Sequence, residues 1–556
     1  MNRLTLILIF LICNISNILA QDLSKIKTEK PFSIDGTLSA SANLYNITGK
    51  KSTRDPFNYV LSGNVDVSVY SFRLPFSFLY SNNNFSYAQP FNRFGLSPEY
   101  KWIKLHLGYR NMSFSPYTLA GHSFLGAGIE LNPGIFRFGA VYGNFNQKTV
   151  PNTINPNDTL QTPTRKGYSF KIGMGSQNNF FDLIFLQIKD DTLSFDNSLY
   201  GSKTPQANSV FGAHFKFTFF KKLTWETEGA ASLLTKNLSS IQPFETGSAT
   251  LQNLLANFSV NSSSEYSTAL LSTLNYNAGK FSIGLQYRRI DPNYQSFGAY
   301  YFNTDIENIT VNTKFRLFKN KFSFSGNIGL QNDNLKKNKA SQSSRVISMA
   351  NFSYNSGKVF SINGSFSNYS INQQAGRLPL NDTIKLYQSN RNVTLTPMLT
   401  FNNSKNQQMV QLNLMLMDLT DHNPFTANNT EVYSRMALIN YFFNHLKSGV
   451  SITAGLNYTS MISSYMEQLI YGVSANAGKS FFKGKLNSNI GIAVNRSNLN
   501  NEDGWVNNMT ASMSWRPHPK HSFKLNLGLI QNMYPESSSI KSFNETKVMI
   551  SYVYKI

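Results

Sequence analysis

Cysteine and long apolar runs are nearly absent from this chain of 556 residues. Cys13 is the only cysteine, so the sequence offers neither a disulfide framework nor a thiolate metal site. No stretch contains the ~20 apolar residues in succession that a helical membrane span needs. Acidic residues are also scarce, with 29 Asp and Glu against 51 Lys and Arg, and the net charge is +22.

The excess positive charge does not indicate nucleic acid as a partner. Lys and Arg are scattered, and neither a basic helix nor an aromatic RNA-binding signature accompanies them. Proximity to an anionic lipid surface explains the charge more simply. We therefore expect membrane lipid, and no nucleic acid, among the partners.

The first twenty residues predict a secretory signal peptide. Met1-Asn2-Arg3 is followed by an apolar run from Leu4 to Ile12, and Ala20 offers a small residue at the cleavage point. Lipidation at Cys13 is the alternative, but Ile12 is bulky where such sites need a small side chain. Cleavage after 1–20 removes the only cysteine and leaves 21–31 as a short periplasmic segment.

Alternation with a period of two dominates what remains. The chain holds 44 Phe and 28 Tyr, with 41% hydrophobic and 14% charged residues. One face of each run is apolar and the other polar, as in strands with one face in an apolar phase. The clearest apolar faces are Phe211, Ala213, Phe215, Phe217 and Phe219; Phe281, Ile283, Leu285 and Tyr287; Val450, Ile452, Ala454, Leu456 and Tyr458; and Val548, Ile550, Tyr552, Tyr554 and Ile556.

The end of the chain decides between a soluble sheet and a membrane barrel. A soluble β-sandwich would give the same local pattern, but here the polar face stays polar over many hairpins and Ile556 lies on an apolar face. A closed barrel in a bilayer must pair its last strand with its first. We predict an all-β fold, with 32–556 forming a single transmembrane antiparallel β-barrel.

Twelve short turns and the two chain ends predict about 26 strands, within a range of about 22 to 28. The turns are expected near 70–71, 101, 132–134, 177–178, 221–222, 278–280, 319–321, 356–358, 404–406, 445–447, 483–485 and 516–520. Longer polar segments at 147–166, 237–262, 367–390 and 418–429 predict short periplasmic turns opposite long extracellular loops, with both termini periplasmic in a Gram-negative outer membrane. Pro75 and Pro98 make 72–111 the least regular region.

A barrel of this width needs something to close it. No folded plug, periplasmic repeat or peptidoglycan-binding domain is expected beside the barrel. Barrels of 16 to 18 strands already leave an aqueous channel. Inward-folded loops or a separate plug or accessory envelope protein are therefore expected. The segment 237–262, with Leu254 and Phe258 among polar residues, is the first candidate for an inward loop, and a surface loop with a little local structure is the alternative.

No catalytic, cofactor or metal constellation emerges from the sequence. His122 precedes Ser123, but adjacent strand residues face opposite sides and cannot share a proton directly. No G-x-S-x-G, H-E-x-x-H or phosphate loop occurs, and Asp190-Asp191 lacks calcium-ligand spacing. We therefore expect no enzymatic activity, no cofactor and no metal.

The segment from Phe94 to Gly143 is unusually rich in Gly, Pro and aromatic residues. Here, and at Ala20-Gln21, the chain resembles large outer-membrane β-barrels of Bacteroidota, a group whose functions are largely unassigned. The glycines fit bulges or close packing, and docking of a plug or partner is the alternative. The residues concerned are Gly95, Pro98, Pro116, Gly121, His122 and Gly126.

The resemblance also implies O-glycan acceptors, because Asp followed by Ser or Thr and an apolar residue looks like an acceptor in that phylum. Three matches lie in predicted loops, with Thr159, Thr192 and Thr383 as the hydroxyl residues.

The sequence thus predicts an outer-membrane barrel that acts as a transport pore or as a membrane component of a larger assembly, closed by its own loops or a partner. Two alternatives stay open: a structural or adhesion barrel without conductance, and a lipid-modifying enzyme.

Overall fold

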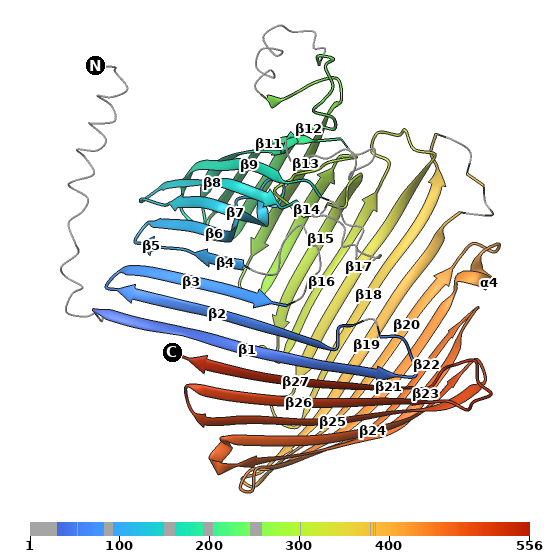
Figure 1. Cartoon of the computed structure of the whole chain (residues 1–556). Helices are drawn as coiled ribbons and strands as arrows, with labels where there is room; N and C mark the ends of the chain where they lie inside the picture. The colour runs from blue at the N-terminus through green and yellow to red at the C-terminus, as the bar shows by residue number, and fades with distance from the viewer. Residues whose placement is uncertain are drawn as a thin grey trace.

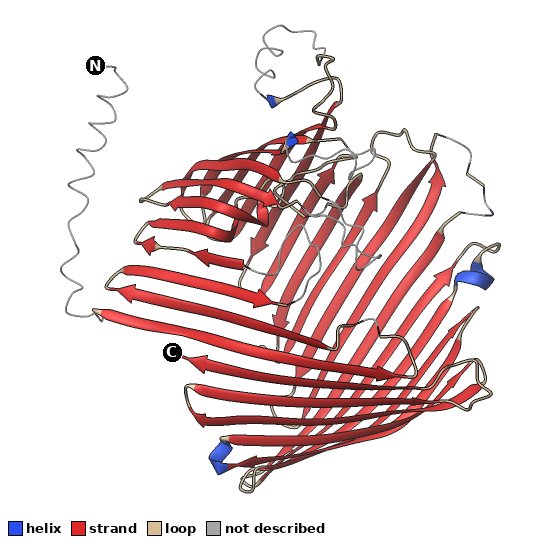
Figure 2. Cartoon of the chain, viewed as in Figure 1, coloured by secondary structure: helices blue, strands red, loops and turns tan. Residues whose placement is uncertain are grey.

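The structure is a computed structural model that describes residues 31–52, 54–82, 93–148, 162–192, 204–244, 258–300, 302–377, 380–381, 383 and 385–556. The predicted signal peptide and residues 21–30 lie outside this set. Strands make up most of the described chain (Figure 2). Among the described residues, no helix is both long and apolar enough to cross a bilayer.

The first half of the chain forms β1 (Phe32–Thr48), β2 (Phe57–Val69), β3 (Phe72–Ser81), β4 (Arg93–Leu96), β5 (Glu99–Tyr100), β6 (Ile103–Ser113), β7 (Ala120–Leu131), β8 (Phe136–Asn146), β9 (Arg165–Gly175), β10 (Phe180–Asp190), β11 (Ala207–Phe219), β12 (Leu223–Thr235), β13 (Ser264–Asn277) and β14 (Phe281–Ile290). The second half forms β15 (Ile306–Leu317), β16 (Phe322–Asn332), β17 (Ser341–Asn355), β18 (Phe360–Ala375), β19 (Tyr387–Asn402), β20 (Asn406–Asp421), α4 (Ala427–Thr430), β21 (Val432–His445), β22 (Val450–Ser463), β23 (Glu467–Phe481), η5 (Phe482–Gly484), β24 (Leu486–Leu499), β25 (Glu502–His518), β26 (His521–Met533) and β27 (Phe543–Lys555).

Apart from β4 and β5, which do not pair with each other, each strand pairs with the next one along the chain. Because β27 also pairs with β1, the sheet closes into a barrel (Figure 1). Both β4 and β5 lie between β3 and β6 and fill one position, so the 27 strands make a 26-strand antiparallel barrel. The break falls at Ser97-Pro98, because Pro98 has no N–H to donate. The predicted fold class and strand number are confirmed.

The outer face of the barrel is apolar, as the alternation predicts. Phe211, Ile283 and Leu456 lie within paired strands, yet their side chains are 46%, 42% and 55% exposed. Such a surface is stable only where hydrocarbon replaces water, which is the setting of an outer-membrane barrel.

The closing seam has a defined register. Ser41 lies opposite Ser551 in the β1–β27 pair, on the polar face. Lys547 lies on the same face of β27, opposite Tyr45 and four residues from Ser551.

We expect a Ser41→Cys, Ser551→Cys double variant to form a disulfide on mild oxidation, because directly opposite residues in an antiparallel pair have Cα atoms about 4.5 to 5.5 Å apart. Mobility in non-reducing gels reports the cross-link. Ser41→Cys with Lys547→Cys is the matched control, since four residues displace the second thiol by about 13 Å. Equal cross-linking of both pairs, or of neither, contradicts a closed barrel in this register.

The two ends of the barrel differ as predicted. All twelve predicted turns connect strands, from Tyr70 between β2 and β3 to Lys520 between β25 and β26. We call this the short-turn end. Phe32 pairs with Val69 beside the first of these turns, and the Ile556 N–H donates to the Gly36 carbonyl, so both ends of the barrel chain lie here.

Two loop boundaries were predicted wrongly. β18 extends to Ala375 and β20 to Asp421, so the loops cover 376–386 and 422–431 only. The extra strand residues are mainly Ser, Asn and Gln on both faces. Alternation disappears where a strand projects beyond the apolar phase, although backbone pairing continues.

A row of five glycines makes one side of the barrel curl tightly. Gly95, Gly108, Gly126, Gly143 and Gly167 lie directly opposite one another across β4, β6, β7, β8 and β9. A Cβ on any of them would lie under 3.0 Å from a backbone oxygen of the neighbouring strand. Because no side chain intervenes, the sheet bends sharply there. Figure 1 shows the resulting curl around β6 to β10.

Candidate functional site: a divided lumen

Two loops from the end opposite the short turns fold into the curled side of the barrel. The first inward segment, 114–119, joins β6 to β7, and the second, 291–305, joins β14 to β15. Leu119, Tyr294 and Phe297 are 0%, 2% and 3% exposed and belong to one buried apolar cluster. We call the space that these segments fill the closed lobe.

Two polar wall residues hold these segments in place. The Glu228 carboxylate on β12 accepts hydrogen bonds from the Ser115 hydroxyl and from the Tyr117 N–H, the latter at 3.2 Å. Asn208 on β11 accepts from the Phe297 N–H at 3.0 Å and donates to the Gln295 carbonyl at 3.3 Å. Asn208 thus satisfies the buried Phe297 N–H. Glu228 adds a second acceptor to the Tyr117 N–H, which also donates to the Ser115 hydroxyl oxygen at 3.2 Å.

The two segments also bind each other. The Tyr294 hydroxyl donates to the Tyr117 carbonyl at 2.6 Å, and the Ala120 N–H donates to the Gly298 carbonyl at 2.9 Å. Burial raises the pKa of the Tyr117 phenol to about 12 and raises that of Tyr294 as well. Both phenols therefore stay protonated at neutral pH, and Tyr294 remains a hydrogen-bond donor there.

Two arginines in the closed lobe pair with buried aspartates. Arg137 donates to Asp182 through Nε and Nη2 at 2.8 and 2.9 Å. Arg165 donates through Nε to Asp190 at 2.7 Å, and its guanidinium lies 3.8 Å from the Phe297 ring centroid. Asp182 and Asp190 are 1% and 3% exposed. Buried carboxylates need such partners because an unpaired buried charge is costly.

The other side of the lumen is open and almost uncharged. On the inward-facing positions of β18 to β24, alternation places mainly Ser, Thr, Asn, Gln and Gly, with some apolar side chains. Asp421, at the end of β20, is the only charged residue in this set. We call this space the open lobe. A cavity of 890 Å³ lies along its wall near the short turns, and a second cavity, of 720 Å³, lies next to it along β14 to β19.

Asp291 ties the second inward segment to the barrel wall. Its carboxylate accepts from the Thr268 N–H at 2.9 Å and from the Thr268 hydroxyl at 2.6 Å. Burial raises the pKa of the Asp291 carboxyl, but the Thr268 donors and the nearby Arg289 outweigh it and hold the pKa below its ordinary value.

A carboxyl with a depressed folded-state pKa stabilises the fold above its unfolded pKa, near about 4, and loses that contribution as pH falls through the folded value. We therefore expect the second inward segment to stay anchored from neutral pH down to about pH 4 and to loosen below it. Single-channel conductance against pH measures this loosening as a rise in current. Asp291→Asn should remove most of the rise, and a rise already complete at pH 6 would contradict the assignment.

Three of the predicted docking residues lie in the first inward segment or just after it. Pro116 lies within it, and Gly121, with φ +69°, follows it at the start of β7. The His122 ring stacks on Tyr300 of the second inward segment, with 4.5 Å between centroids. Gly95 and Gly126 belong to the glycine row, and Pro98 separates β4 from β5. His122 thus contacts one of the chain's own loops.

The described contacts of His122 and Ser123 are with other groups. The His122 Nδ1 is 2.8 Å from the Ser123 backbone carbonyl oxygen, and the Ser123 N–H donates to the Tyr300 hydroxyl at 3.2 Å. Among the residues the structure describes, no group of three or more His, Cys, Asp or Glu side chains is placed to hold a metal ion.

The prediction that 237–262 folds inward is wrong for its described parts. Phe258 packs against Phe185 and Phe211 on the outer face, with ring centroids 5.8 and 5.5 Å apart, and Ile241 is 98% exposed. Leu254 and the rest of 245–257 lie outside the described residues. An apolar loop residue is removed from water equally well against the outer wall or inside the lumen. The composition of the loop therefore did not show whether it folds outward or inward.

Sequence reasoning missed the second inward segment, Glu228 and Asn208. The segment carries five aromatic residues within 291–305, between Ile290 and Ile306, and this density in a loop was the signal available. Glu228 and Asn208 each look like an ordinary polar-face residue of an alternating strand.

Three comparisons with known proteins bear on the fold. No family model matches the chain, and no curated protein matches it. Among solved structures, the chain resembles the P pilus usher PapC of E. coli, with 13% identity, a TM-score of 0.35 and coverage of 94% of this chain and 99% of the usher pore. It also resembles the FrpB iron transporter of Neisseria meningitidis, with 10% identity, a TM-score of 0.39 and coverage of 97% and 83%, and OccAB2 of Acinetobacter baumannii, with 9%, 0.32, 68% and 97%.

These likenesses are low, and they concern architecture alone. The function of this chain is therefore inferred from its own lumen.

Proposed function

We propose that this chain is a non-enzymatic outer-membrane pore that passes polar solutes through its open lobe. The observation that carries the proposal is the mainly polar and almost uncharged wall of β18 to β24 beside a lobe that the chain's own segments close. A lumen of Ser, Thr, Asn and Gln binds water and polar solutes weakly enough for them to leave. The short turns and both ends of the barrel chain face the periplasm in this proposal, as in outer-membrane barrels generally.

The closed lobe makes a separate plug unnecessary for its half of the lumen. Glu228, Asn208 and the paired charges supply the contacts that a plug would make. A partner envelope protein could occlude only the open lobe, and purification from native membranes would reveal it as a stoichiometric companion. The kinship with Bacteroidota barrels remains part of this proposal.

Uptake by liposomes tests the pore. We expect vesicles containing the purified chain to swell in arabinose and more slowly in raffinose, because a finite open lobe admits the smaller sugar faster. Planar bilayers should show discrete current steps. Vesicles that remain impermeable to both sugars, together with silent bilayers, would favour the structural or adhesion barrel instead. Hydrolysis of labelled phospholipid would favour the lipid-modifying enzyme.

Surface O-glycans remain a proposal as well. Thr192 and Thr383 are exposed at the long-loop end, and the Thr383 hydroxyl donates to Asn381 at 2.8 Å. Thr159 lies outside the described residues. Intact mass of the mature chain from its native host tests the idea, and an unmodified mass removes it.

A further inference from the structure

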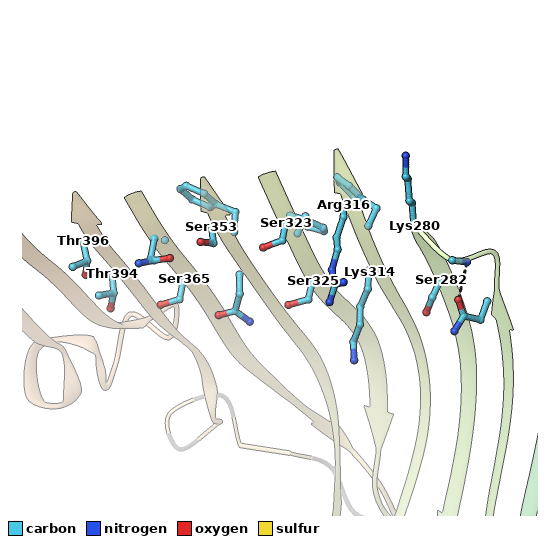
Figure 3. A pocket seen from close by; sticks show the side chains of 18 residues that line it. Lys280, Ser282, Lys314, Arg316, Ser323, Ser325, Ser353, Ser365, Thr394 and Thr396 are labelled. Atoms are coloured by element: carbon cyan, nitrogen blue, oxygen red, sulfur yellow. Dashed lines mark hydrogen bonds between the residues drawn. The ribbon is translucent and has the colours of Figure 1, made fainter. Parts of the chain in front are cut away.

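Three cationic residues lie on neighbouring positions of the lumen wall near the short turns. The Arg316 N–H donates to the Lys280 carbonyl at 2.9 Å, which places these two residues opposite each other, and Lys314 lies opposite Ser282 one step along the same face. Figure 3 shows Lys280, Lys314 and Arg316 side by side at the ends of their strands. We call these three residues the basic triad.

The triad differs from Arg137 and Arg165 of the closed lobe in lacking counter-charges. Arg137 and Arg165 each have a buried aspartate partner. Within the described residues, no ion pair involves a triad member, and no acidic residue lines the 720 Å³ cavity that the triad borders. Like charges directly opposite on one face of a strand pair repel. A bound anion would relieve this repulsion.

Polar side chains extend the triad across four more strands in two parallel rows. The strand register defines both rows. The first row is Lys280, Arg316, Ser323, Ser353, Asn363 and Thr396; the second row is Ser282, Lys314, Ser325, Asn351, Ser365 and Thr394. All twelve line the same cavity, and Figure 3 shows the hydroxyls of neighbouring strands aligned beside the triad. In the part of the chain that the structure describes, no side-chain hydrogen bond involves any of them. They present donors and acceptors to the lumen.

We propose that this wall is a binding site for solutes that combine an anionic group with several hydroxyls, such as sugar acids. The triad binds the carboxylate or phosphate through charge-assisted hydrogen bonds. The two rows bind the hydroxyls, which can each donate and accept. The site faces the lumen, so its ligand is a solute in transit and not a lipid headgroup. The inference builds on the proposed pore and names its substrate class.

Binding in detergent tests the site without any current. We expect the full chain to bind D-glucuronate about ten-fold more tightly than acetate in calorimetric titration, because only glucuronate reaches the two rows. Lys280→Gln, Lys314→Gln, Arg316→Gln should weaken both ligands by at least about ten-fold. Ser353→Ala, Thr396→Ala should weaken glucuronate and leave acetate unchanged. Equal binding of glucuronate to the triad variant and the native chain overturns the proposal.

A matched control variant removes three positive charges at other positions of the short-turn end. Lys221, Lys222 and Lys447 lie in exposed turns outside the cavity, and their triple Gln variant should bind glucuronate as the native chain does. A loss equal to that of the triad variant would mean general attraction to a basic rim and would overturn the site. The folded fraction of each variant is verified by the gel shift between unheated and heated samples.

Reversal potentials in a potassium chloride gradient separate the site from the pore. We expect chloride to permeate more readily than potassium by about three-fold or more, with the ratio falling toward about one in the triad variant. Cation selectivity in the native chain overturns the inference and leaves the pore standing. Glucuronate binding that depends on the triad, in a chain that carries no current, overturns the pore and leaves the site standing.

Discussion

Removing the second inward segment should raise single-channel conductance by about two-fold or more, because it empties the closed lobe. Ile290 and Ile306 are directly paired, so an Asn-Gly turn can replace 291–305 and close the β14–β15 hairpin without altering its register. The first inward segment then loses its hydrogen bonds to Tyr294 and Ser296. Both segments should leave the lumen.

A control deletion of similar size separates this effect from general loop loss. Asn532 and Phe543 are paired at the end of the β26–β27 hairpin, so an Asn-Gly turn can replace 533–542. The control should keep the native conductance. A result in which both deletions, or neither, change the current contradicts the closed lobe.

Glu228 offers a milder route to the same opening. Glu228→Ala removes the acceptor for the Ser115 hydroxyl and one of the two acceptors for the Tyr117 N–H, which keeps only the Ser115 hydroxyl oxygen at 3.2 Å. We expect a cost of about 1 to 3 kcal/mol, since hydrogen bonds to a buried carboxylate are lost. We expect brief additional openings in single-channel records. Glu228→Gln retains an acceptor oxygen and should behave almost like the native chain.

Gly126→Val should prevent the barrel from folding. The new side chain would meet the Tyr142 carbonyl oxygen and the Gly143 Cα of β8, which are fixed by backbone pairing and cannot move aside. Overpacking against backbone atoms costs at least about 3 kcal/mol. The strands cannot move apart to reduce this cost, because the glycines of the row are directly paired from strand to strand. The folded fraction after dilution from urea into detergent micelles measures the effect.

Gly528→Val is the matched control. Gly528 also lies within a strand, but a Cβ there has nothing within 4 Å. Valine favours strands, so this variant should fold as well as the native chain or slightly better. Equal folding of both variants would contradict the close approach of β7 and β8.

The sequence predicted the wall of the barrel far better than its contents. The alternation in stretches such as Phe211 to Phe219 depends on local chemistry, and so do the lysine-rich or glycine-rich turns. The strand number, the turns and the outer face could therefore be predicted directly from the sequence. The polar strand ends near Ala375 and Asp421 did not, since backbone pairing there is independent of alternation.

The contents of the lumen depend on register, which no single stretch of sequence contains. Gly95, Gly108 and Gly126 form a row only after three strands are aligned, and the basic triad needs β14 and β15 in register. Glu228 becomes an anchor because Ser115, 113 residues away, reaches it through the curl. The inward direction of 291–305 likewise follows from a wall that offers Asn208 and Glu228, which composition cannot show.

An electron cryo-microscopy map of the mature chain in lipid nanodiscs tests the divided lumen most directly. We expect a closed 26-strand wall in which density for 114–119 and 291–305 fills the side of the lumen next to the glycine row and contacts Glu228 and Asn208, with the side along β18 to β24 empty. A lumen empty on both sides, or a map with both segments outside the wall, would contradict the account.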